Sequence, residues 1–362
     1  MPLVPALLAL VLSGASASAS PTVYDGGRAV LAHAALQQAF FDRESGLYRD
    51  VAGRPTIADV WPYSQALAGT IALADVPRTG KPSVRLARAR VAALARYARP
   101  DGAYSAGALT HDDVYFDDNE WIALDLLDWH ARTQDRRSLR LAQRIFTVVT
   151  SAWDDDASHP CAGGVFWTSV AGNHDRNTVT TATGALLAMR LYGATHARGY
   201  LDWAQRMLVW VDECMASPDG LLWDHVDLGG VVDRTEWSYN QGTAIGAYLL
   251  LYRYTGDRGA LARAAELGNA SLRYYQGLRL RGEPPFFLAI FFRNALALGR
   301  VGHDPRYRAA AQAYADSVWA DLRDPRTGLV AFHVGAPTRL LEQSALVQIY
   351  AALAQPRPVP GS

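Results

Sequence analysis

The sequence predicts an all-α protein in which paired helices close into an (α/α)6 barrel. Apolar residues recur three or four positions apart along nearly the whole chain, which is the pattern of helices that each bury one face. A polar motif opens every second helix at intervals of roughly 50 to 65 residues, as expected of a repeated helical hairpin. Strand-like alternation is confined to short pieces at 164–167 and 221–223.

In chain order, the apolar periodicity predicts twelve helices. They cover 28–40, 64–73, 83–98, 119–132, 138–152, 178–192, 199–216, 241–254, 258–278, 287–298, 305–322 and 342–353. An aromatic residue or an arginine, followed by asparagine or glutamine, usually opens one helix of each pair, at 61–65, 116–119, 176–178, 238–241, 291–294 and 341–344. The turns expected to end the inner helices include 133–135, 255–257 and 302–304. An open solenoid would carry polar capping repeats at its ends, and the terminal units here resemble the others, so we expect a closed ring.

The length and charge of the chain limit its class. Its 362 residues suit one large barrel domain over 21–356, followed by a short tail at 357–362. The formal net charge is zero, which gives no electrostatic support for a nucleic-acid or membrane-surface partner. Residues 1–20 pass from an apolar stretch into small residues with A-x-A cleavage sites, so we expect a signal peptide, secretion and no integral membrane segment. We expect a monomer.

The cysteines and acidic clusters predict neither a metal nor a cofactor. Cys161 and Cys214 could pair in an exported protein, but their separation in sequence leaves the pairing open. Metal-ligand spacing is absent, and the three aspartates at 154–156 lack the alternation and the glycine of a calcium loop. We therefore expect 154–156 to be a solvent-exposed acidic stretch.

The strongest chemical signal is Asp117-Asp118, which follows Tyr115-Phe116 at the start of a helix. One aspartate could cap that helix, but two adjacent carboxylates repel each other and need another reason. Glycoside hydrolysis needs two carboxyl groups in different protonation states, about 5 Å apart for retention of configuration and about 6.5–9.5 Å apart for inversion. Adjacent residues have Cα atoms about 3.8 Å apart, so this pair favours the retaining reaction.

Taken together, the motifs resemble glycoside hydrolase family 76, the endo-α-1,6-mannanases. The resemblance spans essentially the whole chain after residue 20 and rests on YFDDNEW at 115–121, GGVFW at 163–167, RNT at 176–178, WSYNQGT at 237–243, LYRYTGD at 251–257 and FFR at 291–293. It implies an (α/α)6 barrel that cleaves α-1,6-linked mannan from within. In the family pattern, Asp117 is the nucleophile and Asp118 the acid/base. Glu120 and Thr178 depart from the residues expected at their positions.

Substrate contacts are expected from side chains beside the polar openings. Sugar rings pack their apolar faces on flat aromatic side chains, while asparagine, glutamine and arginine bind the hydroxyls. The aromatic candidates are Trp61, Tyr115, Trp121, Trp167, Trp237, Tyr239 and Phe292, and the polar candidates are Gln65, Asn119, Arg176, Asn177, Asn240, Gln241 and Arg293. The aromatic residues could instead belong to the core, and the polar ones could cap helices or join neighbouring helices.

Other functions fit parts of the pattern. A transglycosylase of the same fold would pass the covalent intermediate to a sugar instead of water. A non-catalytic glycan-binding relative would have no need of two repelling acids. A terpene synthase is also all-α, but its D-D-x-x-D motif would need an aspartate where Trp121 stands. We expect α-mannan or a mannose-containing cell-wall glycan as the partner.

Overall fold

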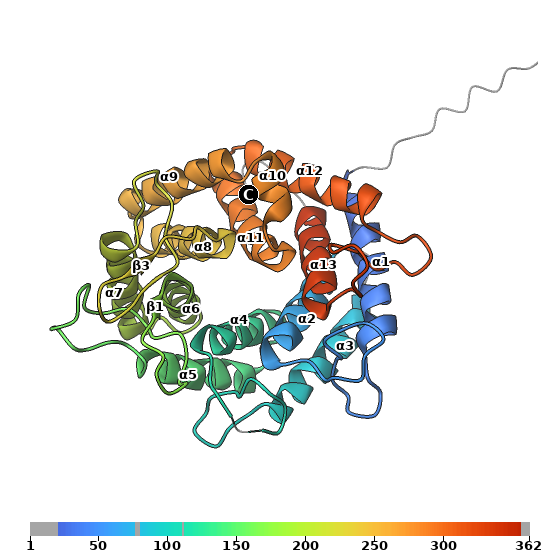
Figure 1. Cartoon of the computed structure of the whole chain (residues 1–362), viewed down its shortest axis with the longest axis horizontal. Coiled ribbons are helices and arrows are strands. Elements are labelled where there is room, and N and C mark those ends of the chain that lie inside the picture. The colour runs from blue at the N-terminus through green and yellow to red at the C-terminus, as the bar shows by residue number, and fades with distance from the viewer. Residues whose placement is uncertain (1–20, 77–79, 111, 356–362) are drawn as a thin grey trace, which may run out of the picture.

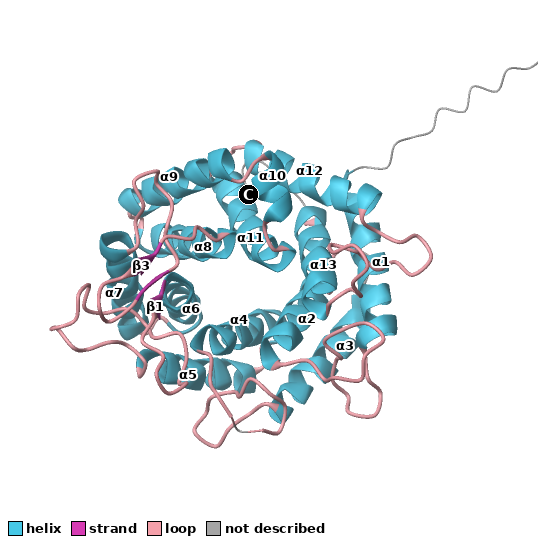
Figure 2. Cartoon of the chain, in the orientation of Figure 1, coloured by secondary structure: helices cyan, strands magenta, loops and turns pink. Residues whose placement is uncertain are grey.

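The computed structural model describes residues 21–76, 80–110 and 112–355, and the regular secondary structure in these residues is almost entirely helical (Figure 1, Figure 2). The helices are α1 (Pro21–Phe40), α2 (Val60–Leu73), α3 (Gly80–Ala93), α4 (Phe116–Thr133), α5 (Arg136–Thr150), α6 (Thr178–Thr195), α7 (Arg198–Cys214), α8 (Ser238–Thr255), α9 (Arg258–Tyr274), α10 (Gly277–Gly282), α11 (Pro285–Val301), α12 (Arg306–Asp321) and α13 (Leu340–Ala354). A 3-10 turn, η1 (Leu94–Arg96), follows α3.

Six of the helices form an inner ring (Figure 1). Around this ring α2, α4, α6, α8, α11 and α13 each contact the next, and α13 contacts α2, so the ring is closed. The helices α1, α3, α5, α7, α9 and α12 lie outside it, each beside the inner helix of its hairpin. Because two apolar layers bury each other in this way, the inner helices are buried on most sides while the outer ones are amphipathic. The predicted (α/α)6 barrel is confirmed.

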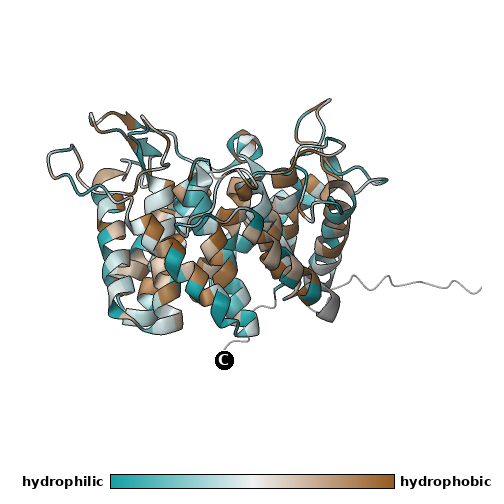
Figure 3. Ribbon diagram, turned by 90° about the horizontal axis from the view of Figure 1, so that it is seen from below, coloured by the Kyte–Doolittle hydropathy of each residue, from teal (hydrophilic) through white to brown (hydrophobic). Residues whose placement is uncertain are grey.

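The two ends of the barrel differ in their connections. Long loops lead from each outer helix to the next inner helix, and they gather along one end (Figure 3). Short turns at the other end lead back outward, and four of those described use left-handed backbone, at Gln134, His196, Gly256 and His303. All inner helices therefore begin at the loop end. Their first turns surround one mouth. The polar openings of the sequence lie at these helix starts except for 291–294, which lies further along α11.

Close approach between inner helices depends on glycine. A Cβ added to Gly242 of α8 would lie 2.6 Å from the Cα of Phe291 in α11. A Cβ on Gly246, one turn further, would lie 2.3 Å from Asn294 Oδ1. The absence of both side chains lets α8 and α11 pack backbone to backbone.

The twelve predicted helices are all present, and seven of them are longer than predicted. The predicted helix at 83–98 ends in the 3-10 turn η1, and that at 258–278 is interrupted between α9 and α10. The strand prediction is corrected in detail: 164–167 and 221–223 form only isolated bridges. The described sheet consists instead of β1 (Arg176–Asn177), β2 (His225–Val226) and β3 (Val232–Asp233), paired antiparallel in the mouth loops. The predicted signal peptide at 1–20 and the tail at 357–362 lie outside the described residues. Among the described helices, none has the length and apolarity that a membrane span requires.

Candidate active site at the barrel mouth

The first turn of α4 presents Asp117 and Asp118 to the mouth. The chain enters this helix through extended backbone at Tyr115, which bridges to Thr168, and the Phe116 N–H donates to the Trp167 carbonyl. The loop between α5 and α6 thus runs antiparallel to the start of α4. The Trp167 ring meets the Tyr115 ring at a centroid distance of 5.1 Å, and the Trp167 side chain hydrogen-bonds the Asp117 carboxylate.

The two carboxyl groups differ in how readily they ionise. Burial raises the pKa of Asp117 to about 7. Hydrogen bonds from Trp167 and backbone N–H groups favour the charged form and lower the pKa, but by less than burial raises it. Burial also raises the pKa of Asp118, and the neighbouring charges of Asp117 and Asp59 raise it further, well above the ordinary value. Because Asp117 loses its proton first, the pair holds one carboxylate and one carboxylic acid near neutral pH.

The polar residue at the fourth position of several inner helices has a structural role. The fourth residue of α4, Asn119, bonds both the N–H and the carbonyl of Tyr104, and the fourth residue of α8, Gln241, does the same to Leu222. In α6 the equivalent Thr181 accepts from the Val165 N–H, and in α13 Gln343 donates to the Ala32 and Gly328 carbonyls. Each fourth residue therefore fixes a neighbouring loop or helix. The prediction of sugar contacts from Asn119 and Gln241 is corrected, because both are fully buried.

The second and third residues of α4 and α8 lie at the mouth instead. In α4 these are Asp117 and Asp118, and in α8 they are Tyr239 and Asn240. Burial raises the pKa of Tyr239 well above its usual value, and the nearby charges of Asp224 and Asp117 raise it further. Asn240 is fully buried and donates to Asp224 Oδ1 at 3.2 Å. Asn240 therefore supports a mouth carboxylate.

An aromatic cluster lines the mouth beside the carboxyl groups. Tyr239 stacks on Phe287 with ring centroids 3.9 Å apart, and Trp237 meets Phe287 edge-on at 5.4 Å. Trp61 lies 5.3 Å from Phe286 and carries an indole N–H without a partner. The predicted residues Trp61, Trp237 and Tyr239 are thus gathered in one place, and the start of α11 adds Phe286 and Phe287.

The structure corrects the predicted sugar contact for Arg176, which is 0% exposed. Its guanidinium donates to Asp154 Oδ2 at 2.9 Å and to the carbonyls of Cys161, Pro160 and Asp227. Asp154 is buried as well, so the expectation of a solvent-exposed stretch at 154–156 is wrong for this residue. The neighbouring Asn177 is also buried, with its backbone N–H bonded to Val165.

Other predicted contacts lie below the mouth. Trp121 and Gln65 are buried but line a cavity of about 400 Å³ inside the barrel, where Gln65 accepts from Gln348. Phe292 is 1% exposed and packs against Phe291 and Tyr314 in the wall of the barrel. The structure therefore corrects the prediction of a mouth position for Phe292.

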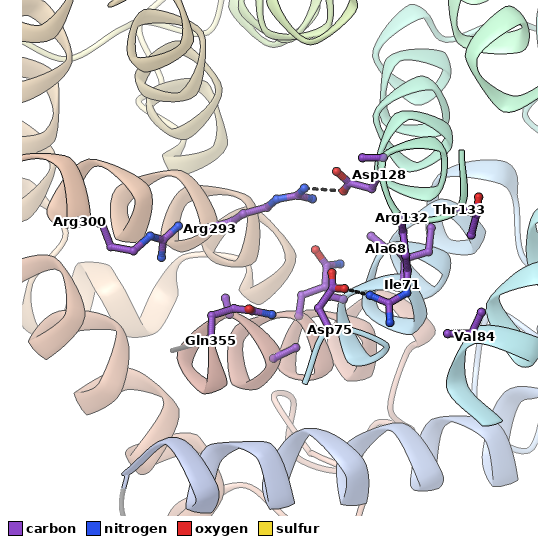
Figure 4. Close-up of a pocket in the computed structure, with 15 residues that line it drawn as sticks. Ala68, Ile71, Asp75, Val84, Asp128, Arg132, Thr133, Arg293, Arg300 and Gln355 are labelled. Carbon is purple, nitrogen blue, oxygen red and sulfur yellow. Dashed lines mark hydrogen bonds and ion pairs between the residues drawn. The ribbon is translucent and has the colours of Figure 1, made fainter. Parts of the chain in front are cut away.

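Arg293 is displaced furthest from the expected position. It lies on the third turn of α11, lines a cavity of about 820 Å³ at the short-turn end, and pairs with Asp128 (Figure 4). The same cavity is lined by the Asp75–Arg132 pair and by Arg300. Most of its residues come from the C-terminal halves of α2, α4, α11 and α13, and Arg132 and Arg300 lie in last turns, where they offset the negative ends of the helix dipoles. This cavity is separate from the carboxylate pair at the start of α4.

Comparison with known proteins identifies the family of this barrel. The family model for Glycosyl hydrolase family 76 matches residues 28–278, well over half of the chain. The chain belongs to glycosyl hydrolase family 76. Among curated relatives, the mannan endo-1,6-alpha-mannosidase DCW1 of Saccharomyces cerevisiae is 30% identical over 146 residues, which is 38% of this chain and 32% of that protein. DFG5 of Candida albicans is 28% identical over 149 residues, again 38% of this chain and 32% of that protein. The match thus spans about a third of the length of these relatives.

Solved structures of family 76 share the fold. The mannosidase Bt3792 from Bacteroides thetaiotaomicron superimposes with a TM-score of 0.83 at 22% identity, over 91% of this chain and 98% of that chain. An inactive variant of the alpha-1,6-mannanase GH76A of Salegentibacter, with two consecutive aspartates changed to asparagine and alpha-1,6-mannotriose bound, has a TM-score of 0.77 at 19% identity. That comparison covers 91% of this chain and 99% of the other.

This family 76 site also contains groups that the sequence analysis missed. Asp224 acts electrostatically on Asp117, and Asp59, at the start of α2, acts on Asp118. Within the described residues, Asp224, His225 and Asp233 are the one group of three or more acidic and histidine side chains close enough to share a cation. The His225 ring already bonds Asp224 at 2.9 Å. Cys161 and Cys214, whose pairing was open, form a disulfide that fastens the loop after α5 to the end of α7.

Proposed function

We propose that this protein is a secreted glycoside hydrolase that cleaves α-1,6-linked mannan internally, with retention of configuration. The observation that carries the proposal is the pair of adjacent carboxyl groups at the barrel mouth, of which Asp117 ionises first. Supporting it are the mannan endo-1,6-alpha-mannosidase relatives and the alpha-1,6-mannotriose complex of a neighbour inactivated at two consecutive aspartates.

The proposed reaction has two steps. The Asp117 carboxylate attacks the anomeric carbon as the glycosidic C–O bond breaks, and Asp118 gives its proton to the departing oxygen. Asp118, now ionised, then takes a proton from a water molecule whose oxygen displaces Asp117 from the anomeric carbon. The raised pKa of Asp118 suits an acid that must hold its proton until the first step.

The aromatic cluster would bind the sugars on either side of the cleaved bond. Trp61, Trp237, Tyr239 and Phe287 offer flat faces for the apolar sides of the rings. The Asp224 carboxylate, which accepts from Asn240 and is partly exposed, is suited to bind hydroxyl groups.

The decisive experiment is product analysis with the purified protein on linear α-1,6-mannan, with α-1,2- and α-1,3-linked mannans alongside. We expect oligosaccharides of intermediate length early in the reaction, from the α-1,6 polymer alone, and an α-anomer as the first product in an NMR time course. Asp117→Asn and Asp118→Asn should each lower turnover by at least about 100-fold. Asp155→Asn, at an aspartate whose side chain is 81% exposed, is the matched control and should not.

Other products would point elsewhere. Chains longer than the supplied substrate would indicate transfer to a sugar, and mannose alone would indicate attack from the chain end. A folded protein that releases nothing from any of the three mannans would refute the proposed hydrolase.

A further inference from the structure

Glu120, one turn along α4 from Asp117, is a buried acid that the two-step reaction does not use. Its side chain is 0% exposed, and neither carboxyl oxygen has a hydrogen-bond partner. It also departs from the residue that the family resemblance predicts at this position. A buried polar group without a partner is costly, so its presence needs an account.

The space around Glu120 is built for its carboxyl group. A Cβ on Gly184 of α6 would lie 2.9 Å from Glu120 Oε1 and 3.1 Å from the thioether of Met207 in α7. Glycine at 184 therefore leaves the room that the carboxyl group occupies. The surrounding stretch of α6, residues 178–189, holds no ionisable side chain, and α7 contributes Met207 at this point. Asp117 is the one ionisable neighbour whose charge acts on Glu120.

Helix geometry directs Glu120 toward Asp117. Residues three apart lie on the same helix face with Cβ atoms about 5–6 Å apart, and helical side chains lean toward the N-terminus. Asp117 also lacks a hydrogen-bond donor at one oxygen, because its Oδ1 atom is buried without a partner. Two ionised carboxylates could not relieve this shortage of donors. A single proton on Glu120 would.

We propose that Glu120 is a positioning residue that stays protonated and donates its O–H to Asp117 Oδ1, which orients the Asp117 carboxylate and leaves its other oxygen for the sugar. Burial and the adjacent charge of Asp117, which both raise the pKa of Glu120, agree with this protonation state. The proposal rests on the proposed role of Asp117 as nucleophile. A hydrogen bond to the charged form of Asp117 also favours its ionisation.

Infrared spectroscopy tests the hydrogen bond without any substrate. At neutral pH, the spectrum of Glu120→Gln should lack one protonated-carboxyl band of the wild type, whereas the exposed control Glu266→Gln should retain every such band. That band should shift in Asp117→Asn, which removes the charged acceptor. A spectrum in which Glu120→Gln loses no band, or in which the Glu120 band is unmoved in Asp117→Asn, would overturn the proposal even if the protein is inactive on mannan.

The pH dependence of kcat/KM distinguishes a Glu120 that positions Asp117 from a Glu120 that only fills space. Glu120→Leu fills the space but cannot donate, so the acid limb of kcat/KM should move up by about one pH unit, a tenfold loss below that limb. Glu120→Gln keeps an N–H donor and should restore the limb to near its wild-type position. Equal losses in both variants with an unmoved limb would mean that Glu120 only packs. If the wild type is inactive, the proposed hydrolase fails, and the infrared result alone decides the fate of this inference.

Discussion

Replacing Arg176 by methionine tests whether this arginine holds the mouth loops or binds sugar. The change keeps the length and apolar stem of the side chain but removes four hydrogen bonds. Asp154 would retain the His159 ring as its side-chain partner, at 3.0 Å. Three carbonyl oxygens would each lose one donor, and that of Pro160 would lose its arginine bond without the second donor that Trp210 gives Cys161 and Gly230 gives Asp227. We therefore expect a loss of stability far above that of a surface ion pair.

The magnitude follows from the burial of both partners. Removing one member of a buried ion pair costs about 3–5 kcal/mol in unfolding free energy, because the remaining charge stays in a poorly solvated place. The matched control is Arg198→Met, where the arginine is 74% exposed and pairs with Asp202 at 2.9 Å. An exposed pair of this kind contributes about 0–1 kcal/mol.

Urea unfolding followed by tryptophan fluorescence measures both variants, since Trp153 and Trp210 flank the same loop. The Arg176→Met midpoint should fall clearly, while Arg198→Met should unfold like the wild type. The double variant Arg176→Met/Asp154→Asn should lose less stability than the two single losses added, because the unpaired charge is gone. Wild-type stability combined with a raised KM for mannan would show that our structural assignment is mistaken and that Arg176 contacts substrate.

Three further predictions follow from the same structure. Because Asp117 must be ionised and its pKa is raised to about 7, kcat/KM on α-1,6-mannan should fall as pH drops through about 7, and a profile flat down to pH 5 would contradict this. Reducing Cys161–Cys214, whose residues are 53 apart in sequence, should lower the unfolding free energy by about 4 kcal/mol, measured by denaturation with and without reductant; equal midpoints would count against it. Gly242→Ala should cost about 3 kcal/mol in the same assay, since its Cβ would meet the Phe291 backbone, while Gly199→Ala, with open space around it, should be tolerated.

The helices and turns could be predicted because their signals are local. Apolar spacing marks each helix, and the turns at Gln134 and Gly256 are flanked by threonine and aspartate side chains that bond the adjacent backbone. The adjacent pair Asp117-Asp118 was recognisable because its repulsion has no simple structural purpose. These features can be read from a few consecutive residues.

The remaining site depends on contacts that no local pattern reports. Arg293 was aligned with the helix openings, but α11 begins at Pro285, so the arginine lies two turns inside the barrel. Phe286 and Phe287 were missed because apolar residues at a helix start also suit a core. Asn119 and Gln241 have the side chains expected of sugar ligands, and only their bonds to Tyr104 and Leu222 reveal a structural role.

Because the ring is closed, its helix packing does not depend on which two neighbouring helices carry the ends of the described chain. Helix α1 packs along α13, and a Cβ on Gly26 would lie 3.8 Å from the Cβ of Ala354. The break between residues 355 and 21 thus occupies the place of one more short turn between an inner and an outer helix. A circular permutant opened at 256–257 and joined across that break would keep every helix–helix neighbour and the whole mouth. The barrel therefore has an order of hairpins but no structurally privileged first one.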